Sequence, residues 1–297
     1  QTTGYTKATM NSGKVRNRGI ELQLDGTPVK TKNFTWNSTF TWAKNYNKVL
    51  SLAAGLTDGQ TIAYTGGTNC ALIAKVGGSI GDIYGYKLKR APDGQVVWKD
   101  GITARTTEFE YVGNAYPAWK AGFSNEFSYK NFRVSILFDG QWGGIVYSQT
   151  HHKMTEHGTL KHTLKYRENP NFEVVGEGVM LDERGQYVPN NVPISVSKYY
   201  ADYWRRANVE TNSFDASFLK LREARIEYTI PSAGLNKIGI ERLTLALYGR
   251  NLAMWTKDFP VYDPEVATLN NGTIVPGSEM GQLPSTRTMG FNLTLKF

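Results

Sequence analysis

Apolar and polar residues alternate strictly along several stretches of this chain. In the last stretch, one row consists of apolar residues and the positions between them are small or polar: Met289, Phe291, Leu293, Leu295 and Phe297 against Gly290, Asn292, Thr294 and Lys296. A period of two with different chemistry on its two faces is typical of a β-strand that lies between two different media. The pattern therefore predicts a strand from Thr286 to Phe297.

The same alternation recurs along the chain and predicts further strands. It covers residues 20–25, 34–42, 119–130, 134–138, 214–230 and 243–248. In the stretch 214–230 the phase slips near Arg222 and Glu223, which predicts a β-bulge. With a possible continuation near Gly140, the chain contains seven or eight strands of membrane-spanning length, about 9–11 residues or more.

Short and long connections alternate between these predicted strands. The short ones are Gly26–Lys32, Lys130–Phe132 and Pro231–Glu241, and the long ones are Leu52–Pro117, Tyr147–Ser213 and Trp255–Ser285. Transmembrane β-barrels have short turns on one side of the membrane and long loops on the other. Within the long connections, turn residues predict hairpins around Ala91–Gly94 and Glu183–Gly185, and Tyr199–Arg206 is predicted as a short helix.

Composition narrows the classes of protein. Of the 297 residues, 40% are hydrophobic and 20% charged, and mean hydropathy is −0.42. No segment approaches the roughly 18 consecutive apolar residues of a membrane helix. The net charge is +8, but Lys and Arg are spread singly, so no nucleic-acid-binding surface is predicted. Cys70 is the only cysteine, which excludes an intrachain disulfide and a cysteine-rich metal site.

Two clusters of titratable residues invite a chemical interpretation. Four histidines, His151, His152, His157 and His162, lie within twelve residues and could bind a metal, although their spacing matches no metal motif and histidines of a surface loop are the commoner explanation. Asp263-Pro264-Glu265, with Asp258 nearby, could provide acid–base groups or a rigid turn. The chain has no nucleotide-binding or hydrolase motif, so neither an enzyme nor a cofactor is predicted.

Aromatic residues make up 12% of the chain. They suit the aromatic girdles of a barrel, a carbohydrate-binding surface or the core of a β-sandwich. Those in the long connections could bind a ligand or pack the loops together, and the ligand candidates are Trp98, Trp142, Tyr147, Tyr203 and Trp204.

Several segments resemble the SusC/RagA family of TonB-linked outer-membrane transporters of Bacteroidota. The most specific are Phe214–Tyr228, Leu247–Leu252 with Tyr262–Glu265, and Pro284–Phe291. Segments upstream follow the family in the same order: Gly19–Leu22, Ile80–Tyr86 and Gly113–Pro117. The resemblance extends over nearly the whole chain.

This resemblance implies an all-β fold, an antiparallel transmembrane β-barrel with long extracellular loops. Residues 1–297 would form the C-terminal third of a plugged barrel of about 22 strands. The plug, the TonB box and the N-terminal strands have no counterpart in the sequence, so we expect it to be part of a longer protein. Phe297 would then be the terminal aromatic residue that the barrel assembly machinery reads.

The resemblance also implies a function, namely import of oligosaccharides or peptides across the outer membrane. A SusD-like surface lipoprotein would cap the barrel, TonB would supply energy through the plug, and the strands would contact the lipid bilayer. Polar rows such as Glu21/Gln23/Asp25 would line the interior. Two alternatives are a secreted β-rich carbohydrate-binding module and a passive porin.

Overall fold

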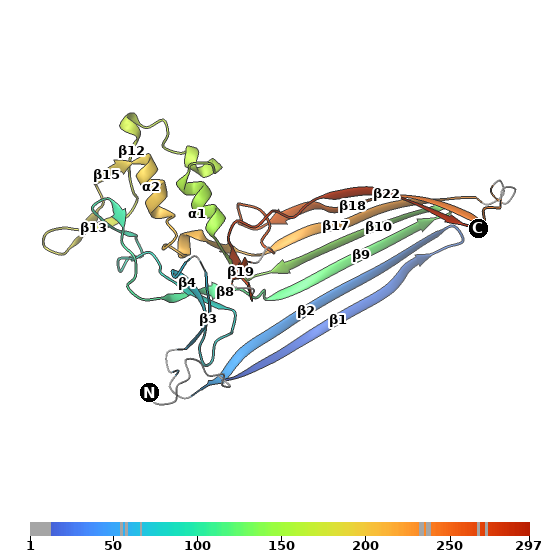
Figure 1. The fold of residues 1–297 in the computed structure, drawn as a ribbon, viewed down its shortest axis with the longest axis horizontal. Helices are drawn as coiled ribbons and strands as arrows, with labels where there is room; N and C mark the ends of the chain where they lie inside the picture. The colour runs from blue at the N-terminus through green and yellow to red at the C-terminus, as the bar shows by residue number, and fades with distance from the viewer. Residues whose placement is uncertain are drawn as a thin grey trace, which may run out of the picture.

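A seven-stranded antiparallel sheet of long strands dominates the computed structural model, which describes residues 13–53, 56, 59–65, 67–231, 235, 239–265, 268–270 and 273–297. Its strands lie side by side in the order β1-β2-β9-β10-β17-β18-β22 (Figure 1). Their bounds are Gly13–Lys30, Phe34–Leu52, Trp119–Tyr129, Phe132–Trp142, Phe218–Ile230, Arg242–Thr256 and Thr288–Lys296. Every neighbouring pair is antiparallel, which confirms the predicted fold class.

The strand register gives the sheet one apolar and one polar face. Residues that pair directly across an antiparallel ladder point to the same face. One such row crosses all seven strands and is apolar throughout: Val29, Trp36, Phe127, Val134, Ile226, Leu247 and Phe291. Another row, on the opposite face, is polar at six of seven positions: Asp25, Thr39, Ser124, Leu137, Glu223, Arg250 and Thr288.

The apolar face is not covered by any layer of described residues. Phe291 is 79% exposed and Leu247 is 67% exposed, although both are large and apolar. An exposed apolar surface of this extent marks an interaction with membrane or protein. No helix among the described residues is long and apolar enough to cross a bilayer.

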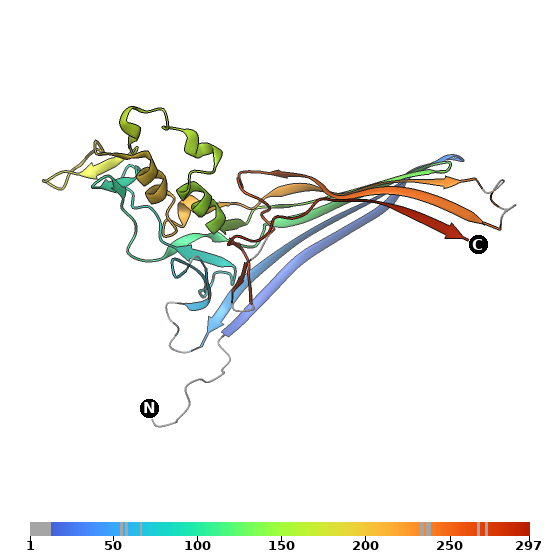
Figure 2. The same cartoon turned by 45° about the horizontal axis from the view of Figure 1, so that its top comes forward.

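Short turns join the strands at one end of the sheet and long connections join them at the other (Figures 1 and 2). Lys130 and Asn131 form the turn between β9 and β10, where Lys130 has a φ of 51°. The turn after β1 is tighter than predicted: β1 continues through a bulge to Lys30, and only residues 31–33 connect it to β2. The asymmetry of the connections is therefore confirmed.

The predicted irregularity of β17 is also present. Leu137 pairs with Glu223 and Phe138 with Leu221, so Arg222 is the extra residue of a β-bulge. The single strand predicted over 214–230 is wrong, however, because it divides at Ala216 and Ser217. There the backbone amide of Ser217 donates to the carboxylate of Asp215 at 2.8 Å, and the chain leaves the main sheet.

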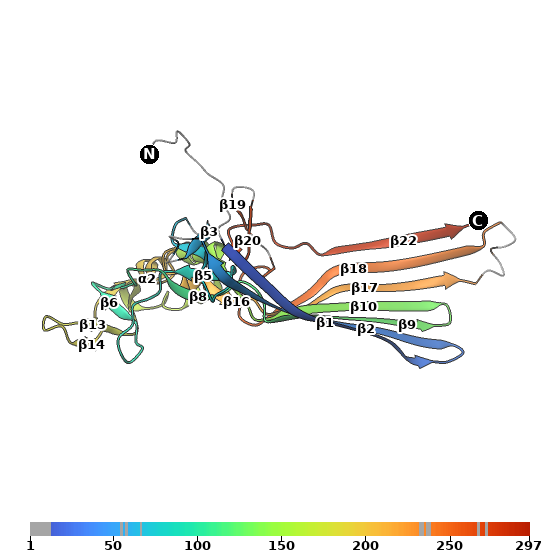
Figure 3. The ribbon, with the colours of Figure 1, turned by 90° about the horizontal axis from the view of Figure 1, so that it is seen from below.

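The three long connections fold together into one region beside the sheet (Figure 3). Its strands form small sheets: β3 (Gln60–Thr65), β4 (Cys70–Ala74), β5 (Asp82–Gly85) and β8 (Glu110–Asn114); β6 (Val97–Lys99), β7 (Ile102–Thr103), β13 (Val179–Leu181) and β14 (Tyr187–Pro189); β11 (Ile145–Ser148), β16 (Ser213–Asp215) and β21 (Ser278–Glu279); β12 (Glu173–Val175) and β15 (Pro193–Ser195); β19 (Thr268–Asn270) and β20 (Thr273–Val275). Its helices are α1 (Gln149–Glu156) and α2 (Val196–Tyr203), with 3₁₀ turns at Lys161–Leu164, Pro170–Phe172 and Glu210–Asn212.

Both predicted hairpins and the predicted helix are present in this region. The amide of Ala91 donates to the carbonyl of Gln95 at 2.9 Å, and β13 pairs with β14 around the second turn. The helix begins three residues earlier than expected, because the side chain of Ser195 accepts a hydrogen bond from the amide of Lys198 and caps it.

Candidate functional site

The polar face of the main sheet forms a hollow close to the long connections. Its volume is about 450 Å³, within the range of ligand-binding clefts. The polar side chains that line it come from β1, β2, β9 and β10 and from the connection between β18 and β22: Glu21, Gln23, Thr41, Lys120, Asp139, Gln141 and Glu265. Strict alternation places these residues on one face, so the hollow follows directly from the strand pattern.

An ion-pair network closes one side of this hollow. Lys220 on β17 donates to both carboxylate oxygens of Asp263 at 2.7 Å and also contacts Glu265. Arg222 donates to Asp139 at 2.5 Å and to Glu265 at 2.6 Å. Two cations and three carboxylates therefore join the strand wall to the connection that follows β18.

The centre of the network is buried. The side chains of Lys220 and Asp263 are each only 4% exposed. Burial by itself raises the pKa of the Asp263 carboxyl, but the hydrogen bond from Lys220 and the amide of Glu265 outweigh it, so the pKa lies below its ordinary value. The Asp263 carboxyl is therefore ionised at neutral pH, and its bonds to Lys220 hold Asp263 and its turn against the polar face.

A second long connection rests on the same face. Asn47 on β2 accepts hydrogen bonds from the hydroxyl of Ser79 at 3.0 Å and from the amide of Ile80 at 2.9 Å. Asn47 lies on the polar face, at an even spacing from Thr41. Because two connections fold over the polar face while the apolar face stays bare, the polar face is the inner one.

Glu21 and Lys120 are the two charged residues lining the hollow that take no part in the ion-pair network. Among the described residues, neither has an ion-pair or hydrogen-bond partner. Both lie in the same row across the sheet, since each pairs with Ala43 on β2. Two strand spacings separate them, which is about 10 Å. A carboxylate and an ammonium group thus line the same hollow from strand positions about 10 Å apart.

The five aromatic residues predicted to bind ligand occupy different environments. Trp98 is 1% exposed, donates to the carbonyl of Glu177 at 2.9 Å and stacks on Tyr199 and Tyr203. Tyr147 is fully buried, and burial raises the pKa of its hydroxyl.

Trp204 packs on Tyr203 in the same loop region, whereas Trp142 lies on the apolar face of the sheet, stacked on Trp119. These placements favour the packing interpretation of Trp98 and Tyr147, and ligand contact by the five residues stays a prediction. So does an assembly role for Phe297, which is 78% exposed beyond β22.

The structure divides the histidine cluster: His157 and His162 are exposed, as the surface-loop interpretation expects, whereas the other two histidines are buried. His151 and His152 lie on α1 and are 3% and 4% exposed. Their Nδ1 atoms lie 2.9 Å from the side-chain oxygen of Asn212 and 2.7 Å from the carbonyl of Trp204. Burial lowers the pKa of His151 to about 4, so it is neutral at neutral pH. No group of three or more potential metal ligands occurs in the part of the chain that the structure describes.

The site residues could be predicted only in part. Alternation predicted that Glu21 and Gln23 lie on the polar side of their strand. The pairing of Lys220 with Asp263 joins residues 43 positions apart, and no local pattern announces it. The Asp263-Pro264-Glu265 segment does form a turn, in which the amide of Glu265 donates to Asp263 at 3.0 Å.

Comparison with known proteins identifies relatives of the whole chain. It is 29% identical over 325 residues to the TonB-dependent receptor P26 of Formosa agariphila, which covers 99% of this chain and 30% of that protein. It is 26% identical to the TonB-dependent receptor SusC of Bacteroides thetaiotaomicron over 47% of this chain and 15% of that protein.

Among solved structures, the RagAB peptide transporter matches with a TM-score of 0.66 and 20% identity, covering 99% of this chain and 31% of the transporter chain. No protein-family model matches the chain. The relatives are receptors and transporters rather than enzymes, and the chain spans about 30% of the length of the receptor P26 and of the RagAB transporter chain. The predicted resemblance to SusC/RagA proteins, the barrel fold and the location in the outer membrane are confirmed.

Proposed function

We propose that this chain, a homologue of TonB-dependent receptors of the SusC/RagA type, forms one wall of an outer-membrane importer for oligosaccharides or peptides. The observation that supports this function is the two-faced sheet with connections folded over its polar side. A passive porin would also have a polar inner face. In this chain, however, buried ion pairs hold a connection against that face, which suits a channel that is closed at rest. In the protein that contains this chain, further strands would complete the barrel around the polar face.

The hollow suggests how a solute would be held. Gln23, Thr41 and Gln141 offer amide and hydroxyl groups that hydrogen-bond to sugar hydroxyls or to peptide groups. Glu21 and Lys120 add opposite charges, which fit the ammonium and carboxylate groups of a peptide. A neutral oligosaccharide would bind the amide and hydroxyl groups and would gain little from the two charges.

The remaining components of the system are also part of the proposal. A SusD-like lipoprotein would cover the region formed by the long connections, because that region lies at the end of the sheet where barrels carry their extracellular loops. TonB would act through a plug inside the barrel and supply the energy that opens the channel. The barrel assembly machinery would insert the strands into the membrane.

Uptake by whole cells tests the proposal. Cells that carry the complete protein should accumulate a fluorescent peptide or oligosaccharide, and deletion of its gene or of the TonB system should abolish accumulation. Uptake that persists without TonB would indicate a passive porin, and recovery of the protein in the culture medium without membranes would indicate a secreted binding module.

Two variants then separate the substrate classes. Glu21→Gln and Lys120→Met remove the two available charges but keep the side-chain size, and each should lower peptide uptake about threefold to tenfold if the charges are desolvated by the solute. Thr39→Val, on the same face in another row, is a matched control. Uptake of a neutral oligosaccharide should not change in any of the three.

A further inference from the structure

Four basic side chains lie together on one face of β1 and β2, near the end of these strands that leads to the long connections. They are Arg16, Arg18, Lys44 and Lys48, and we call them the basic patch. Arg16 pairs directly with Lys48, and Arg18 pairs with Tyr46, which lies between the two lysines on the same face. Successive positions on one face of a strand are about 7 Å apart, so the four charges occupy a compact area.

The register places the basic patch on the outward face of the sheet. Lys44 pairs with Ile20, which is 64% exposed and belongs to the apolar face. On the opposite side of β2, Asn47 bonds to Ser79, and Val49 is fully buried against the same connection. In the complete barrel the patch therefore faces the surroundings and not the interior, whichever strand pairs with the free edge of β1.

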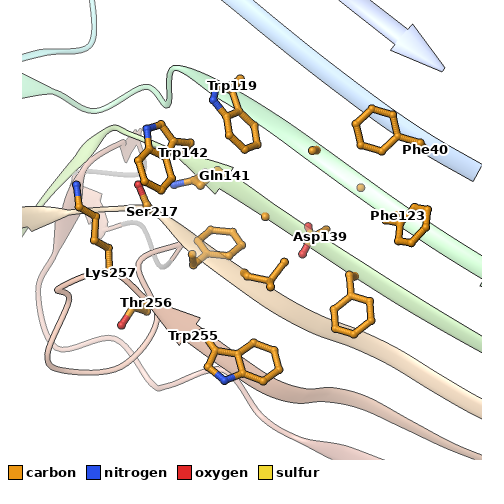
Figure 4. Close-up of a pocket in the computed structure, with 16 residues that line it drawn as sticks. Phe40, Trp119, Phe123, Asp139, Gln141, Trp142, Ser217, Trp255, Thr256 and Lys257 are labelled. Atoms are coloured by element: carbon orange, nitrogen blue, oxygen red, sulfur yellow. The ribbon is translucent and has the colours of Figure 1, made fainter. Parts of the chain in front are cut away.

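Two tryptophans mark the membrane interface beside the basic patch. Figure 4 shows Trp119 and Trp142 next to each other at the loop end of β9 and β10, where they pair across the two strands. Lys44 takes the next position in this row, because the preceding residue, Ala43, pairs with Lys120. Aromatic girdles lie where a barrel leaves the hydrocarbon. The patch therefore begins at the interface and extends from it towards the long connections.

No carboxylate of the described residues neutralises the basic patch. None of its four cations forms an ion pair within that part of the chain, and Lys44 instead lies 4.8 Å from the ring centroid of Tyr46. Lys257, a cation beside the same tryptophans, differs in this respect because it forms a 2.7 Å ion pair with Asp215. Like charges directly opposite each other destabilise a sheet. An anionic partner would therefore stabilise the patch.

We propose that the basic patch binds the phosphate groups of a phosphorylated glycolipid of the lipopolysaccharide class, while the acyl chains of that lipid lie along the adjoining apolar face. The long connections mark the outer end of the barrel, so the lipid belongs to the outer leaflet. Arginine binds phosphate through paired hydrogen bonds and lysine binds it as a point charge. A soluble acidic protein would use the charges but not the apolar residues directly beside them. The site lies on the outer wall, so its test measures lipid binding and is independent of solute uptake.

Native mass spectrometry of the complete protein, titrated with lipid in detergent, tests the site. The probes are bis-phosphorylated lipid A and the same lipid after enzymatic removal of its phosphates. The phosphorylated probe should bind about tenfold more tightly, because each Lys or Arg close to an anionic headgroup strengthens binding about fivefold and exposed charges are partly screened. Equal affinities of the two probes would overturn the proposal.

Charge-removing variants locate the site. The double variant Arg16→Gln/Arg18→Gln should lower the affinity for phosphorylated lipid A about tenfold and leave the affinity for the dephosphorylated lipid unchanged. Lys48→Gln alone should lower it about threefold to fivefold, which keeps the test decisive if the double variant does not assemble. The matched control is Lys130→Gln, which removes a lysine that also packs on a tyrosine ring, 5.4 Å from the centroid of Tyr129, but at the opposite end of the sheet. Unchanged affinity in an assembled patch variant would contradict the site.

Two further measurements separate the glycolipid from other anionic partners. Phosphatidylglycerol, which carries a single phosphate, should bind about fivefold more weakly than bis-phosphorylated lipid A. Equal binding of these two lipids would show that any anionic headgroup suffices and would overturn the assignment to a glycolipid. If the double variant instead loses a co-purifying acidic protein and keeps its affinity for lipid A, the occupant of the patch is that protein and the proposal is wrong.

Discussion

Lys220 is the residue on which the candidate site depends most. It is an almost fully buried cation on a strand wall, and its partners Asp263 and Glu265 belong to the connection that follows β18, which Arg222 contacts as well. Removing one member of a buried ion pair leaves the other charge desolvated, which costs more than the pair contributes.

We therefore predict that Lys220→Met destabilises the docked connection by about 3–5 kcal/mol, while the double variant Lys220→Met/Asp263→Leu recovers part of this loss. Hydrogen exchange of residues 257–265 in the complete protein measures the effect. The control is Lys257→Met, which breaks an ion pair whose lysine is 53% exposed and should cost at most about 1 kcal/mol. Equal effects of the two single variants would contradict a buried network.

His151 makes the loop region sensitive to acid. Its pKa is about 4 in the fold and would be near 6.5 in an unfolded chain, chiefly because burial disfavours the charged ring, and the neighbouring His162 and His152 act in the same direction. The unfolded state then binds more protons between these two values, so stability is complete above about pH 6.5 and is lost as the pH falls towards 4.

We expect the segment around α1 to lose up to roughly 3 kcal/mol of protection between pH 7 and pH 4. Hydrogen exchange, corrected for the intrinsic pH dependence of the amide rate, measures this loss. In His151→Gln the side chain can still bond to Asn212 but does not titrate, so most of the pH dependence should disappear. If His151→Gln keeps the full pH dependence of protection, other titratable groups are responsible for it.

At the scale of single strands, β22 provides the sharpest test of which face meets lipid. Leu293 pairs with Leu245 on the apolar face, and its neighbour Asn292 pairs with Ala246 on the polar face. Leu293→Arg should destabilise the folded protein by about 2–4 kcal/mol if it lies near the bilayer midplane. Unfolding in lipid vesicles gives the free energy of unfolding of this variant and of Asn292→Arg. The second substitution should change that free energy little, because its side chain lies on the polar face. A larger penalty for Asn292→Arg would reverse the assignment of the faces.

The strands and their faces could be predicted from the sequence because both are local properties. Alternation with a period of two determines which side chains share a face, and the phase slip at Arg222 correctly located the bulge of β17. The break at Ser217 was missed because Phe214 and Phe218 continue the apolar pattern across it. It depends instead on Asp215 bonding to the Ser217 amide, a local turn that alternation does not reveal.

The arrangement of the long connections could not be predicted, because the contacts that determine it are distant in sequence. β13 pairs in parallel with β6, and Thr65 bonds to Ser278 across 213 residues. Short strands of three residues carry too little periodicity to indicate their partners. His151 and His152 illustrate the consequence, since these two polar residues are buried and bond to Asn212 and Trp204 from another part of the chain.

At the scale of the whole molecule, the sheet and the loop region obtain their stability differently. The sheet has a hydrogen-bonded ladder but only lipid against its apolar face. The loop region has its own core, to which all three long connections contribute: Cys70, Leu72, Ile83, Tyr147, Val209 and Val275. The connections therefore behave as one folded body rather than as independent surface loops.

Glu279 holds this body together and supports a prediction about the whole of it. Its fully buried carboxylate accepts hydrogen bonds from Ser148 at 2.6 Å and Thr150 at 2.5 Å, and so joins the third connection to the second. Glu279→Ala leaves buried donors without an acceptor, at a cost of about 1–3 kcal/mol. When opening and closing are faster than cleavage, the rate of proteolysis is proportional to the population of the open state. It should therefore rise about tenfold for each 1.4 kcal/mol of stability that is lost.

The measurement is trypsin digestion of intact cells, followed by the rate of cleavage after Arg205 and Arg206, which lie in the partly buried interior of the loop region. A set of independent loops would be cut there rapidly with or without the substitution. Glu183→Ala, at the exposed tip of the hairpin between β13 and β14, is the control and should leave the rate unchanged. Rapid cleavage of the unaltered protein, or equal rates for the two variants, would show that the connections do not fold as one body, and the proposed surface for a capping lipoprotein would then lack a rigid base.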